Sequence, residues 1–488
     1  MNKFLSLILL LAVITSVGSA GAQAEWISLG TATVEEMFTE RDFDPAYDSF
    51  EEIFLADGVS KSDSPAVRID GDTIQISQEG VYKLSGSLSN GQIIIYAPEK
   101  AKVQLVLDNV SITNQGGAAI YAINGDKVFI TAEKGSVNSL VSVGELTDED
   151  IDGAVYAKTD ICFNGEGQIS IESESGHGIA TKDDLKICNG SYSIKAAKHG
   201  LSGKDSIRIG GGSIDITAGS DGLHSDHNDE DKGYIFIIGG TLDISSAKDG
   251  IDCTNHFTML DGAVSINAES DGINAAGEDD FDGSCFVAVS GGVLNITAKE
   301  DGIDSNGSLG VSGGEVYISA APRGGDGALD YGTGAEVSGG VIIAASGRDM
   351  AANFLSADAQ GSMLCVFSQP HSAGENITLS LDGKELLSFA PMLDYQAVVI
   401  SSPDVVEGNT YTVSAGDETL EITMSVKISS NGFSPKGAFG MSPPGAMPPE
   451  GFPQMEAMPQ DFAPGGKPGW HRGEFGAAPD GAPMKPER

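Results

Sequence analysis

The six-residue stretch Asp221-Gly222-Leu223-His224-Ser225-Asp226 decides the fold, because the chain repeats it at regular steps. Copies follow at Asp249-Gly250-Ile251-Asp252-Cys253-Thr254, Asp271-Gly272-Ile273-Asn274-Ala275-Ala276 and Asp301-Gly302-Ile303-Asp304-Ser305-Asn306, and a degenerate copy stands at Asp326-Gly327-Ala328-Leu329. The basic step is 22 residues, and the two longest steps, of 28 and 30 residues, contain acidic insertions at 227–231 and 278–282. A fixed step with insertions confined to one place predicts a solenoid whose loops leave from one face.

The repeat has the periodicity of β-strands. Each step contains short runs in which apolar and polar side chains alternate, and Gly-Gly, Asp-Gly or Asn-Gly separates the runs. Alternation with such turn residues is typical of strands, and no repeat has apolar residues at helical spacing. A coil of about 22 residues with about three short strands predicts an all-β protein, a parallel β-helix whose coils stack about 4.8 Å apart.

Composition divides the chain into five parts. Residues 1–24 have a positive end, an apolar run and the small-x-small site Ala22-Gln23-Ala24, which predict a cleaved secretory signal rather than a membrane anchor. We expect residues 25–65 to form a lead-in segment and 66–360 the β-helix. Residues 361–430 lack the repeat and contain a hairpin signal at Asp382-Gly383, so they are expected to form a C-terminal β cap or a small β module. Residues 431–488 are rich in Gly, Pro and Met, which predicts a disordered tail.

The balance of charge excludes several kinds of partner. The 488 residues include 28 Lys and Arg against 70 Asp and Glu, for a net charge of −42. Such a chain is repelled by nucleic acids and by anionic membranes, and it attracts cations. With the predicted signal, this composition predicts a monomeric protein that is secreted or held at the cell surface, with no membrane span in its mature chain.

A column of carboxylates is the feature of the repeat that points to chemistry. Alternation places the aliphatic residue after each Asp-Gly inside the coil and turns the leading Asp and its polar partners outward. Carboxylates stacked about 4.8 Å apart repel each other by about 3.5 kcal/mol at an effective dielectric constant of about 20, and Ca²⁺, which takes six to eight oxygen ligands, would neutralise them. The expected calcium ligands are Asp221, Asp226, Asp249, Asp252, Asp271, Asn274, Asp301, Asp304 and Asp326.

Two other interpretations of these residues stay open. Asp-Gly is an ordinary turn dipeptide, and Asp side chains cap turns without any metal. His224, His227 and His256 are compatible with a transition-metal site, although the surrounding carboxylates favour calcium.

The five cysteines do not define a metal site or a disulfide framework, because their number is odd and no Cys-x-x-Cys occurs. Cys253 stands where other coils have Ser or Ala, so it is expected to be a small interior residue. Cys162 and Cys188 hold matching places in two coils, where either free thiols or a disulfide would fit.

Further motifs along the chain resemble a known family. They are Phe38-Thr39-Glu40-Arg41-Asp42, Gly80-Val81-Tyr82-Lys83-Leu84-Ser85-Gly86, Val103-Gln104-Leu105-Val106-Leu107-Asp108-Asn109-Val110, Asp126-Lys127-Val128-Phe129-Ile130-Thr131 and His177-Gly178-Ile179-Ala180-Thr181-Lys182-Asp183-Asp184-Leu185-Lys186-Ile187. With the Asp-Gly-Ile repeats, they resemble the secreted β-helix carbohydrate-binding proteins of clostridia and relatives, which are structurally akin to calcium-dependent polysaccharide lyases. The likeness extends over roughly residues 35–430.

The resemblance implies a right-handed parallel β-helix, bound calcium with the leading Asp residues as ligands, and affinity for plant-wall polysaccharides such as cellulose and acidic pectin-like chains. His177 and His199 depart from the Asp pattern, so little calcium is expected in their coils.

We therefore expect a non-catalytic, calcium-binding protein that recognises cellulose or a polyuronate. An anionic sugar would reach this negative surface through bridging Ca²⁺, and the residues that contact it stay unassigned. One alternative is a calcium-dependent pectate-type lyase, which needs a basic residue beside the metal; no pair of bases stands out among the candidates Lys182, Lys204, Lys248, Lys299 and Arg323. A second alternative is a surface spacer made rigid by calcium.

Overall fold

The computed structural model describes residues 34–277 and 284–431. The predicted signal, the whole acidic insertion at 278–282 and the predicted tail beyond residue 431 lie outside these ranges. The helices of the described part are α1 (Val34–Met37) and α2 (Glu40–Phe43), and nearly all other regular structure is β-strand. Neither helix is long and apolar enough to cross a membrane.

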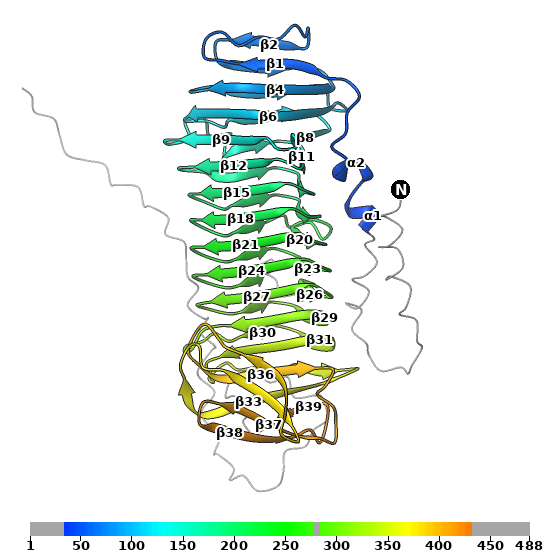
Figure 1. Ribbon diagram of the computed structural model, residues 1–488, viewed down its shortest axis with the longest axis vertical. Helices are drawn as coiled ribbons and strands as arrows, with labels where there is room; N and C mark the ends of the chain where they lie inside the picture. The colour runs from blue at the N-terminus through cyan, green and yellow to red at the C-terminus, as the bar shows by residue number, and fades with distance from the viewer. Residues whose placement is uncertain (1–33, 278–283, 432–488) are drawn as a thin grey trace, which may run out of the picture. The chain divides into compact units, whose positions relative to one another are not determined.

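Each regular coil contributes three strands. Equivalent strands of successive coils pair along the solenoid and form three rows, here called ladders (Figure 1). The first ladder is a twelve-stranded sheet, parallel except for the hairpin at its start. Its strands are β2 (Val67–Asp70), β3 (Thr73–Ile76), β5 (Gln92–Tyr96), β7 (Ile120–Asn124), β10 (Gly153–Ala157), β13 (His177–Thr181), β16 (Leu201–Gly203), β19 (Leu223–Ser225), β22 (Ile251–Cys253), β25 (Ile273–Ala275), β28 (Ile303–Ser305) and β30 (Leu329–Tyr331).

The other two ladders merge into one large sheet, because long strands near the ends of the solenoid take part in both. The second ladder contains β8 (Lys127–Ala132), β11 (Asp160–Gly165), β14 (Asp184–Ile187), β17 (Ser206–Ile209), β20 (Tyr234–Ile237), β23 (His256–Met259) and β26 (Phe286–Val289). The third contains β9 (Val137–Val143), β12 (Gln168–Ser173), β15 (Ser191–Ala196), β18 (Ser213–Ala218), β21 (Thr241–Ser246), β24 (Ala263–Ala268) and β27 (Val293–Ala298). The sheet also includes β1 (Glu51–Leu55), β4 (Gly80–Leu88), β6 (Lys102–Gln115), β29 (Ser308–Ser319), β31 (Gly334–Ser346) and β32 (Ser356–Ala357).

The solenoid core is built from the aliphatic residue that follows each Asp-Gly. Leu223 pairs with Ile251, Ile251 with Ile273 and Ile273 with Ile303 in consecutive coils, and none of the four is exposed. Cys253 is 1 % exposed and aligned with Ser225 and Ala275. The predicted parallel β-solenoid, its inward aliphatic stack and the interior place of Cys253 are thus confirmed.

The glycine of each Asp-Gly is required by close packing. A Cβ placed on Gly250 would lie 2.2 Å from Ile266 Cγ2 and 2.6 Å from the Gly272 carbonyl oxygen of the next coil. Equivalent clashes with an Ile methyl group and the next coil occur at Gly178, Gly200, Gly222, Gly272 and Gly302. The repeated glycine therefore lets neighbouring coils approach, and it does so without a left-handed backbone.

We expect Gly250→Ala to destabilise the protein by about 1–3 kcal/mol, because neither the β-branched methyl group nor the facing carbonyl can move away easily. The measurement is the midpoint of urea-induced unfolding. Gly334→Ala is the matched control, since a Cβ there meets nothing within 4 Å. Equal midpoints for the two variants would contradict the packing explanation.

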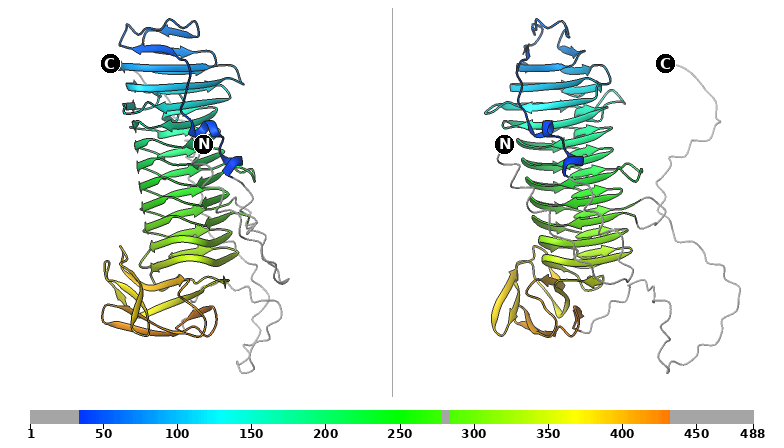
Figure 2. Two further views of the ribbon diagram at one scale, coloured as in Figure 1. Left: turned by 45° about the vertical axis from the view of Figure 1, so that its right-hand side comes forward. Right: turned by 90° about the vertical axis from the view of Figure 1, so that its right-hand side faces the viewer.

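An N-terminal strap, residues 34–47, runs along the second ladder (Figure 2). Phe38 packs with Phe129, Cys162, Cys188 and Phe236 of four different coils. The two cysteines are free, with their Sγ atoms 3.9 Å apart, so the structure contains no disulfide between them. The segment 25–65, interpreted as a lead-in, therefore includes a docked strap and the first solenoid strand, β1, which pairs with β4.

The C-terminal part closes the solenoid with antiparallel strands. Strand β36 (Tyr395–Ser402) pairs with β31 and with β33 (Gly361–His371), which also pairs with β39 (Ile428–Ser430). A separate four-stranded sheet contains β34 (Ile377–Leu381), β35 (Lys384–Phe389), β37 (Thr410–Ala415) and β38 (Glu418–Thr423). The hairpin predicted at Asp382-Gly383 joins β34 to β35, and both turn residues have positive φ.

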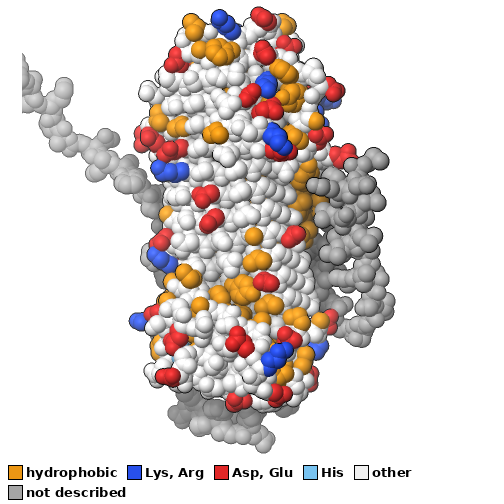
Figure 3. Space-filling model, in the orientation of Figure 1, with side chains coloured by type: hydrophobic (Ala, Val, Ile, Leu, Met, Phe, Trp, Pro, Cys, Tyr) orange, Lys and Arg blue, Asp and Glu red, His pale blue; other side chains and the backbone are white. Residues whose placement is uncertain are grey.

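Charged residues are sparse on the face that includes β12 to β27, as Figure 3 shows. The outward positions of these strands are mainly Ser, Thr and Asn, and every second residue is buried. The carboxylates of the repeat lie instead on the twelve-stranded sheet.

Candidate functional site

Three columns of polar side chains follow the twelve-stranded sheet, because equivalent residues of successive coils are in register. The leading column, just before each strand, contains His177, His199, Asp221, Asp249, Asp271 and Asp301. The middle column, at the centre of each strand, contains Tyr156, Ala180, Ser202, His224, Asp252, Asn274, Asp304 and Asp330. The trailing column, just after each strand, begins with Lys158, Lys182, Lys204 and Asp226. The face is therefore basic and histidine-rich upstream and acidic downstream.

The leading column is a hydrogen-bonded ladder. Asp221 Oδ1 accepts the amide of Asp249 at 3.2 Å, Asp249 Oδ1 that of Asp271 at 3.0 Å, and Asp271 Oδ1 that of Asp301 at 2.8 Å. Upstream, the Nδ1 atoms of His177 and His199 accept the corresponding amides at 3.2 Å. His and Asp can therefore occupy the same position, because each offers an acceptor to the next coil.

The expectation that the leading side chains face solvent is wrong for Asp221 and Asp301, whereas the other members of the column are half-buried. Asp221 is 3 % exposed and Asp301 7 % exposed, because both carboxylates turn along the stack to reach the next amide. One oxygen of each leading carboxylate thus accepts a backbone amide, as the metal-free interpretation of Asp-Gly expects. In Asp221, Asp249 and Asp271, the Oδ2 atom takes no part in the ladder.

The acidic part of the face holds carboxylates that raise one another's pKa. Burial raises the pKa of Asp301 to about 8 and that of Asp271 to about 7, and neighbouring aspartates add to both shifts. Burial, with the nearby charges of Asp330, Asp249 and Asp326, likewise raises the pKa of Asp304 to about 6. Without a cation, this surface therefore favours partial protonation over full ionisation.

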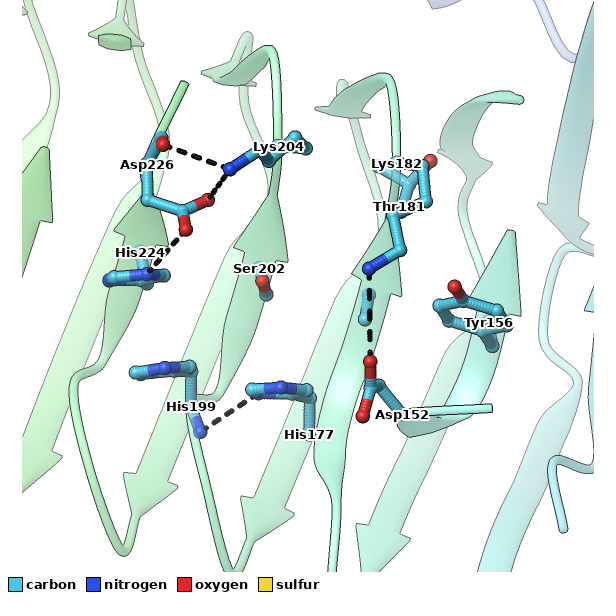
Figure 4. Close-up of a pocket in the computed structure, with 11 residues that line it drawn as sticks. Asp152, Tyr156, His177, Thr181, Lys182, His199, Ser202, Lys204, His224 and Asp226 are labelled. Atoms are coloured by element: carbon cyan, nitrogen blue, oxygen red, sulfur yellow. Dashed lines mark hydrogen bonds and ion pairs between the residues drawn. The ribbon is translucent and has the colours of Figure 1, made fainter. Parts of the chain in front are cut away.

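Upstream of the carboxylates, the same face is hollowed into a groove of about 250 Å³ (Figure 4). Ala180 and Ser202 give it a floor of small side chains, Lys182 and Lys204 line one side, and the histidines of the leading column line the other. The lining also includes Asp152, Tyr156, Thr181, His224 and Asp226. The groove thus offers ammonium groups, imidazoles and hydroxyls to a ligand that lies along the sheet.

The two lysines of the groove are held by ion pairs. Lys204 Nζ lies 3.1 Å from Asp226 Oδ1, and Lys182 Nζ lies 3.8 Å from Asp152 Oδ2. Their side chains are 38 % and 57 % exposed, so both remain accessible. Sequence inspection found no pair of bases, because the two residues are a full coil apart and meet only in the trailing column.

A stack of three imidazoles forms the histidine side of the groove. The rings of His177 and His199 are 4.8 Å apart and those of His199 and His224 are 4.1 Å apart, and both pairs are nearly parallel. Burial, with the charges of His199 and Lys198, lowers the pKa of His177 to about 3.

His224 has the opposite electrostatic environment. Burial disfavours its charged form, but hydrogen bonds to Asp221, Asp226 and Asp252 outweigh burial and raise the pKa of His224 to about 11. Burial alone would raise the pKa of Asp221, yet its hydrogen bonds to His199 and His224 hold that pKa well below its usual range.

The structure brings most of the predicted calcium ligands onto one face but corrects one of them. Leu329 pairs with Ile303, so Gly327, and not Asp326, follows Asp301 in the leading column. The step from Asp301 to its neighbour in the stack is therefore one residue longer than the spacing of the Asp-Gly pairs. The same shift places Asp330 opposite Asp304, where sequence inspection missed it. Asp226 lies in the trailing column, beside Lys204.

The histidine trio considered for a transition metal is not brought together. His256 lies in β23 of the large sheet, stacked between Tyr234 and Phe286, while His227 faces Asp205 and Asp229. His224 instead joins His199 and Asp221, whose candidate ligand atoms all lie within 4.8 Å of one another. Among the other basic candidates, Lys299 pairs with Glu269 on an exposed loop, and Lys248 and Arg323 do not line the groove.

The fold and this face define the class of protein: a parallel β-solenoid that presents a long polar surface with a groove. Residues 70–327 and 246–361 match the model of a family described as carbohydrate-binding domain-containing protein. The match covers more than half of the chain, and the chain belongs to that family.

One similar protein is a carbohydrate-binding domain-containing protein of Acetivibrio thermocellus, 31% identical over 149 residues. The alignment covers 30% of this chain and 52% of that protein, so the chain spans about half the length of the curated relative it matches. A solved structure, the gadolinium derivative of a polysaccharide lyase-like protein from C. thermocellum, is 31% identical with a TM-score of 0.45, covering 47% of this chain and 95% of that one.

Proposed function

We propose that this chain is a secreted, monomeric and non-catalytic protein that binds an acidic plant-wall polysaccharide through calcium. One observation carries the proposal: the acidic columns and the lysine-lined groove lie end to end on the same sheet. A polyuronate lying along this face meets ammonium groups in the groove and bridging Ca²⁺ beyond it. Neutral cellulose fits the face less well, because Tyr156 is the aromatic residue that lines the groove and it is 1 % exposed.

The donor set of the acidic part suits a hard cation. The Oδ2 atoms of the leading column and the side chains of Asp252, Asp304 and Asp330 are all oxygen donors, which Ca²⁺ prefers. The leading and middle columns run parallel, so an ion there can take oxygens from both. Bound calcium would remove the charge repulsion that raises the pKa values of Asp271, Asp301 and Asp304.

The direct test is retention on polygalacturonate gel and on cellulose, with calcium and then with a chelator. We expect retention on polygalacturonate that the chelator abolishes, with no new ultraviolet absorbance in the supernatant. Rising absorbance would reveal unsaturated products and make the protein a lyase. A calcium-dependent rise in melting temperature without retention on either matrix would instead support the rigid spacer.

The groove lysines allow the sugar site to be located. We expect the double variant Lys182→Ala/Lys204→Ala to weaken polygalacturonate binding about tenfold to a hundredfold at saturating calcium. Each substitution removes an ammonium group that would donate a charge-assisted hydrogen bond to a uronate. The assay is the affinity for a short polygalacturonate in solution.

The control is Lys134→Ala/Lys195→Ala, which removes two exposed lysines that pair with Glu166 and Glu172 away from the groove. It removes the same charge, so it separates a local contact from the effect of net charge. Equal losses in the two double variants would place the sugar outside the groove.

A further inference from the structure

The cluster of His199, Asp221 and His224 differs in chemistry from the carboxylate columns. Each residue offers a ligand atom, and these atoms lie within 4.8 Å of one another, which holds for no other group of three or more His, Cys, Asp or Glu side chains in residues 34–277 and 284–431. Calcium takes oxygen ligands, whereas zinc and its first-row neighbours bind imidazole nitrogen together with carboxylate oxygen. We propose that His199 Nδ1, Asp221 Oδ2 and His224 Nδ1 bind a transition-metal ion of the zinc class, with Asp252 as the fourth ligand.

Three distances between the proposed ligand atoms can be compared with those around a tetrahedral ion. Asp221 Oδ2 lies 2.9 Å from His199 Nδ1 and 3.4 Å from His224 Nδ1. Asp252 Oδ2 lies 2.8 Å from His224 Nδ1. Zinc bonds of 2.0–2.2 Å place neighbouring ligand atoms about 3.4 Å apart. The ligand atoms therefore need to separate by about half an ångström to admit the ion.

Binding requires a defined change in the two rings. They are parallel to within 3°, so they must tilt toward each other for both nitrogens to point at one ion. His199 Nδ1 faces the Asp221 amide at 3.2 Å, at the long end of the hydrogen-bond range, so the ion replaces a weak contact. At His224 Nδ1, the ion replaces the proton shared with Asp221 and Asp252.

The surroundings favour a cation that enters from the groove. The side chains of His199, Asp221 and His224 are 17 %, 5 % and 19 % exposed, so the ligands are largely shielded from water. His199 and His224 also line the groove, which gives an ion a route to them. The leading column changes from His199 to Asp221 at the coil whose middle-column residue is His224. Nitrogen and oxygen donors therefore meet at this coil.

The test uses the untagged full chain in excess Ca²⁺, so that sites made only of oxygens are filled. Zn²⁺ is titrated by calorimetry, and Co²⁺ serves as a spectroscopic probe of the ligands. We expect one equivalent of tightly bound Zn²⁺ and a visible Co²⁺ spectrum of nitrogen and oxygen ligation that Zn²⁺ abolishes. His199→Asn and His224→Asn should each weaken Zn²⁺ binding more than about 100-fold.

Both substitutions are chosen to preserve the fold. Asn at position 199 keeps an acceptor for the Asp221 amide, and Asn274 shows that the middle column accommodates Asn. His177→Asn is the control, because His177 belongs to the same stack but not to the cluster, and its binding should equal that of the wild type.

The proposal is wrong if Zn²⁺ fails to bind in excess Ca²⁺, if either cluster variant binds as tightly as the wild type, or if His177→Asn weakens binding equally. Polysaccharide retention is not a readout here. Asp221 and Asp252 are also expected calcium ligands, but Asp249, Asp271, Asp301, Asp304 and Asp330 are not part of the zinc site. Failure of zinc binding therefore leaves calcium-dependent sugar binding by these other carboxylates to its own test, and the reverse also holds.

Discussion

Asp42→Ala is expected to weaken docking of the N-terminal strap by about 3–5 kcal/mol. The Asp42 carboxylate is 0 % exposed and lies 2.9 Å from Lys127 Nζ and 3.3 Å from Lys186 Nζ. The two lysines belong to coils that are separated by one intervening coil. Their side chains are 10 % and 6 % exposed. Removing the carboxylate leaves two buried positive charges without their partner, which costs far more than the lost attraction alone.

The measurement is hydrogen–deuterium exchange of the Phe38, Asp42 and Asp44 amides, which are hydrogen-bonded within the strap. A loss of about 3–5 kcal/mol should speed their exchange on the order of 100- to 1,000-fold. Asp44→Ala is the matched control, because the exposed Asp44 carboxylate only caps the Ala46 amide. Replacing both lysines by Met together with Asp42→Ala should restore much of the protection, and failure to do so would contradict the ion-pair explanation.

The same carboxylate makes the strap sensitive to acid. Burial would raise the pKa of Asp42, but the Thr39 amide and the charges of Lys127 and Lys186 outweigh it and hold that pKa below its ordinary value. A depressed pKa gives stability that is present above the unfolded-state value of about 3.9 and is lost as the pH falls through the folded-state value. After division by the intrinsic exchange rate at each pH, the protection of the strap amides should therefore fall in acid in the wild type and hardly change with pH in Asp42→Ala.

The solenoid could be predicted from the sequence because two independent features of the repeat indicate it. The Asp-Gly-Ile step sets the stacking of Leu223, Ile251, Ile273 and Ile303, and the alternating runs set the strands between the turns. The strap could not be predicted in the same way. Its helices are four residues long and its anchoring carboxylate, Asp42, gains meaning only from lysines that lie 85 and 144 residues away in the chain.

The leading column of the site could be predicted from the sequence, but members of the middle and trailing columns were missed. Asp249, Asp271 and Asp301 share a motif position, so their alignment follows from the sequence. Lys182 and Lys204 belong to a column that changes from Lys to Asp226 and then to uncharged residues, so the Asp-Gly motif does not mark them. Asp330 was missed because Leu329, and not Ala328, pairs with Ile303, so the Asp-Gly pair at 326–327 is one residue out of register with the earlier copies.

The second large effect concerns the stability of the acidic columns in the presence of a chelator. We expect the chelated protein to lose stability on the order of several kcal/mol between about pH 4 and pH 8. Asp304, Asp271 and Asp301 have folded-state pKa values raised to about 6, about 7 and about 8, in each case first by burial and then by neighbouring aspartates. One pKa unit corresponds to about 1.4 kcal/mol, so three such groups dominate the pH dependence.

Stability falls as the pH rises, because the folded state binds more protons than the unfolded state. Over this range the folded protein holds protons on these carboxyl groups that the unfolded chain, with pKa values near 3.9, has already released. Their contribution is therefore present in full below about pH 4 and is lost as the pH rises through 6 to 8. The proposed calcium binding requires the ionised carboxylates of the folded state, so we expect added calcium to restore the melting temperature most at the upper end of the range.

Asp301→Asn isolates the contribution of one carboxylate. Asn keeps the Oδ1 acceptor for the Gly327 amide but removes the charge that faces Asp271 and Asp330. In chelator we expect this variant to melt above the wild type at pH 8 and close to it at pH 4, and in calcium to gain less stability than the wild type. Asp243→Asn, on the exposed face of β21, is the control and should show neither change. If chelated wild-type protein is as stable at pH 8 as at pH 4, the carboxylate columns do not repel one another, and the need for a neutralising cation disappears with the repulsion.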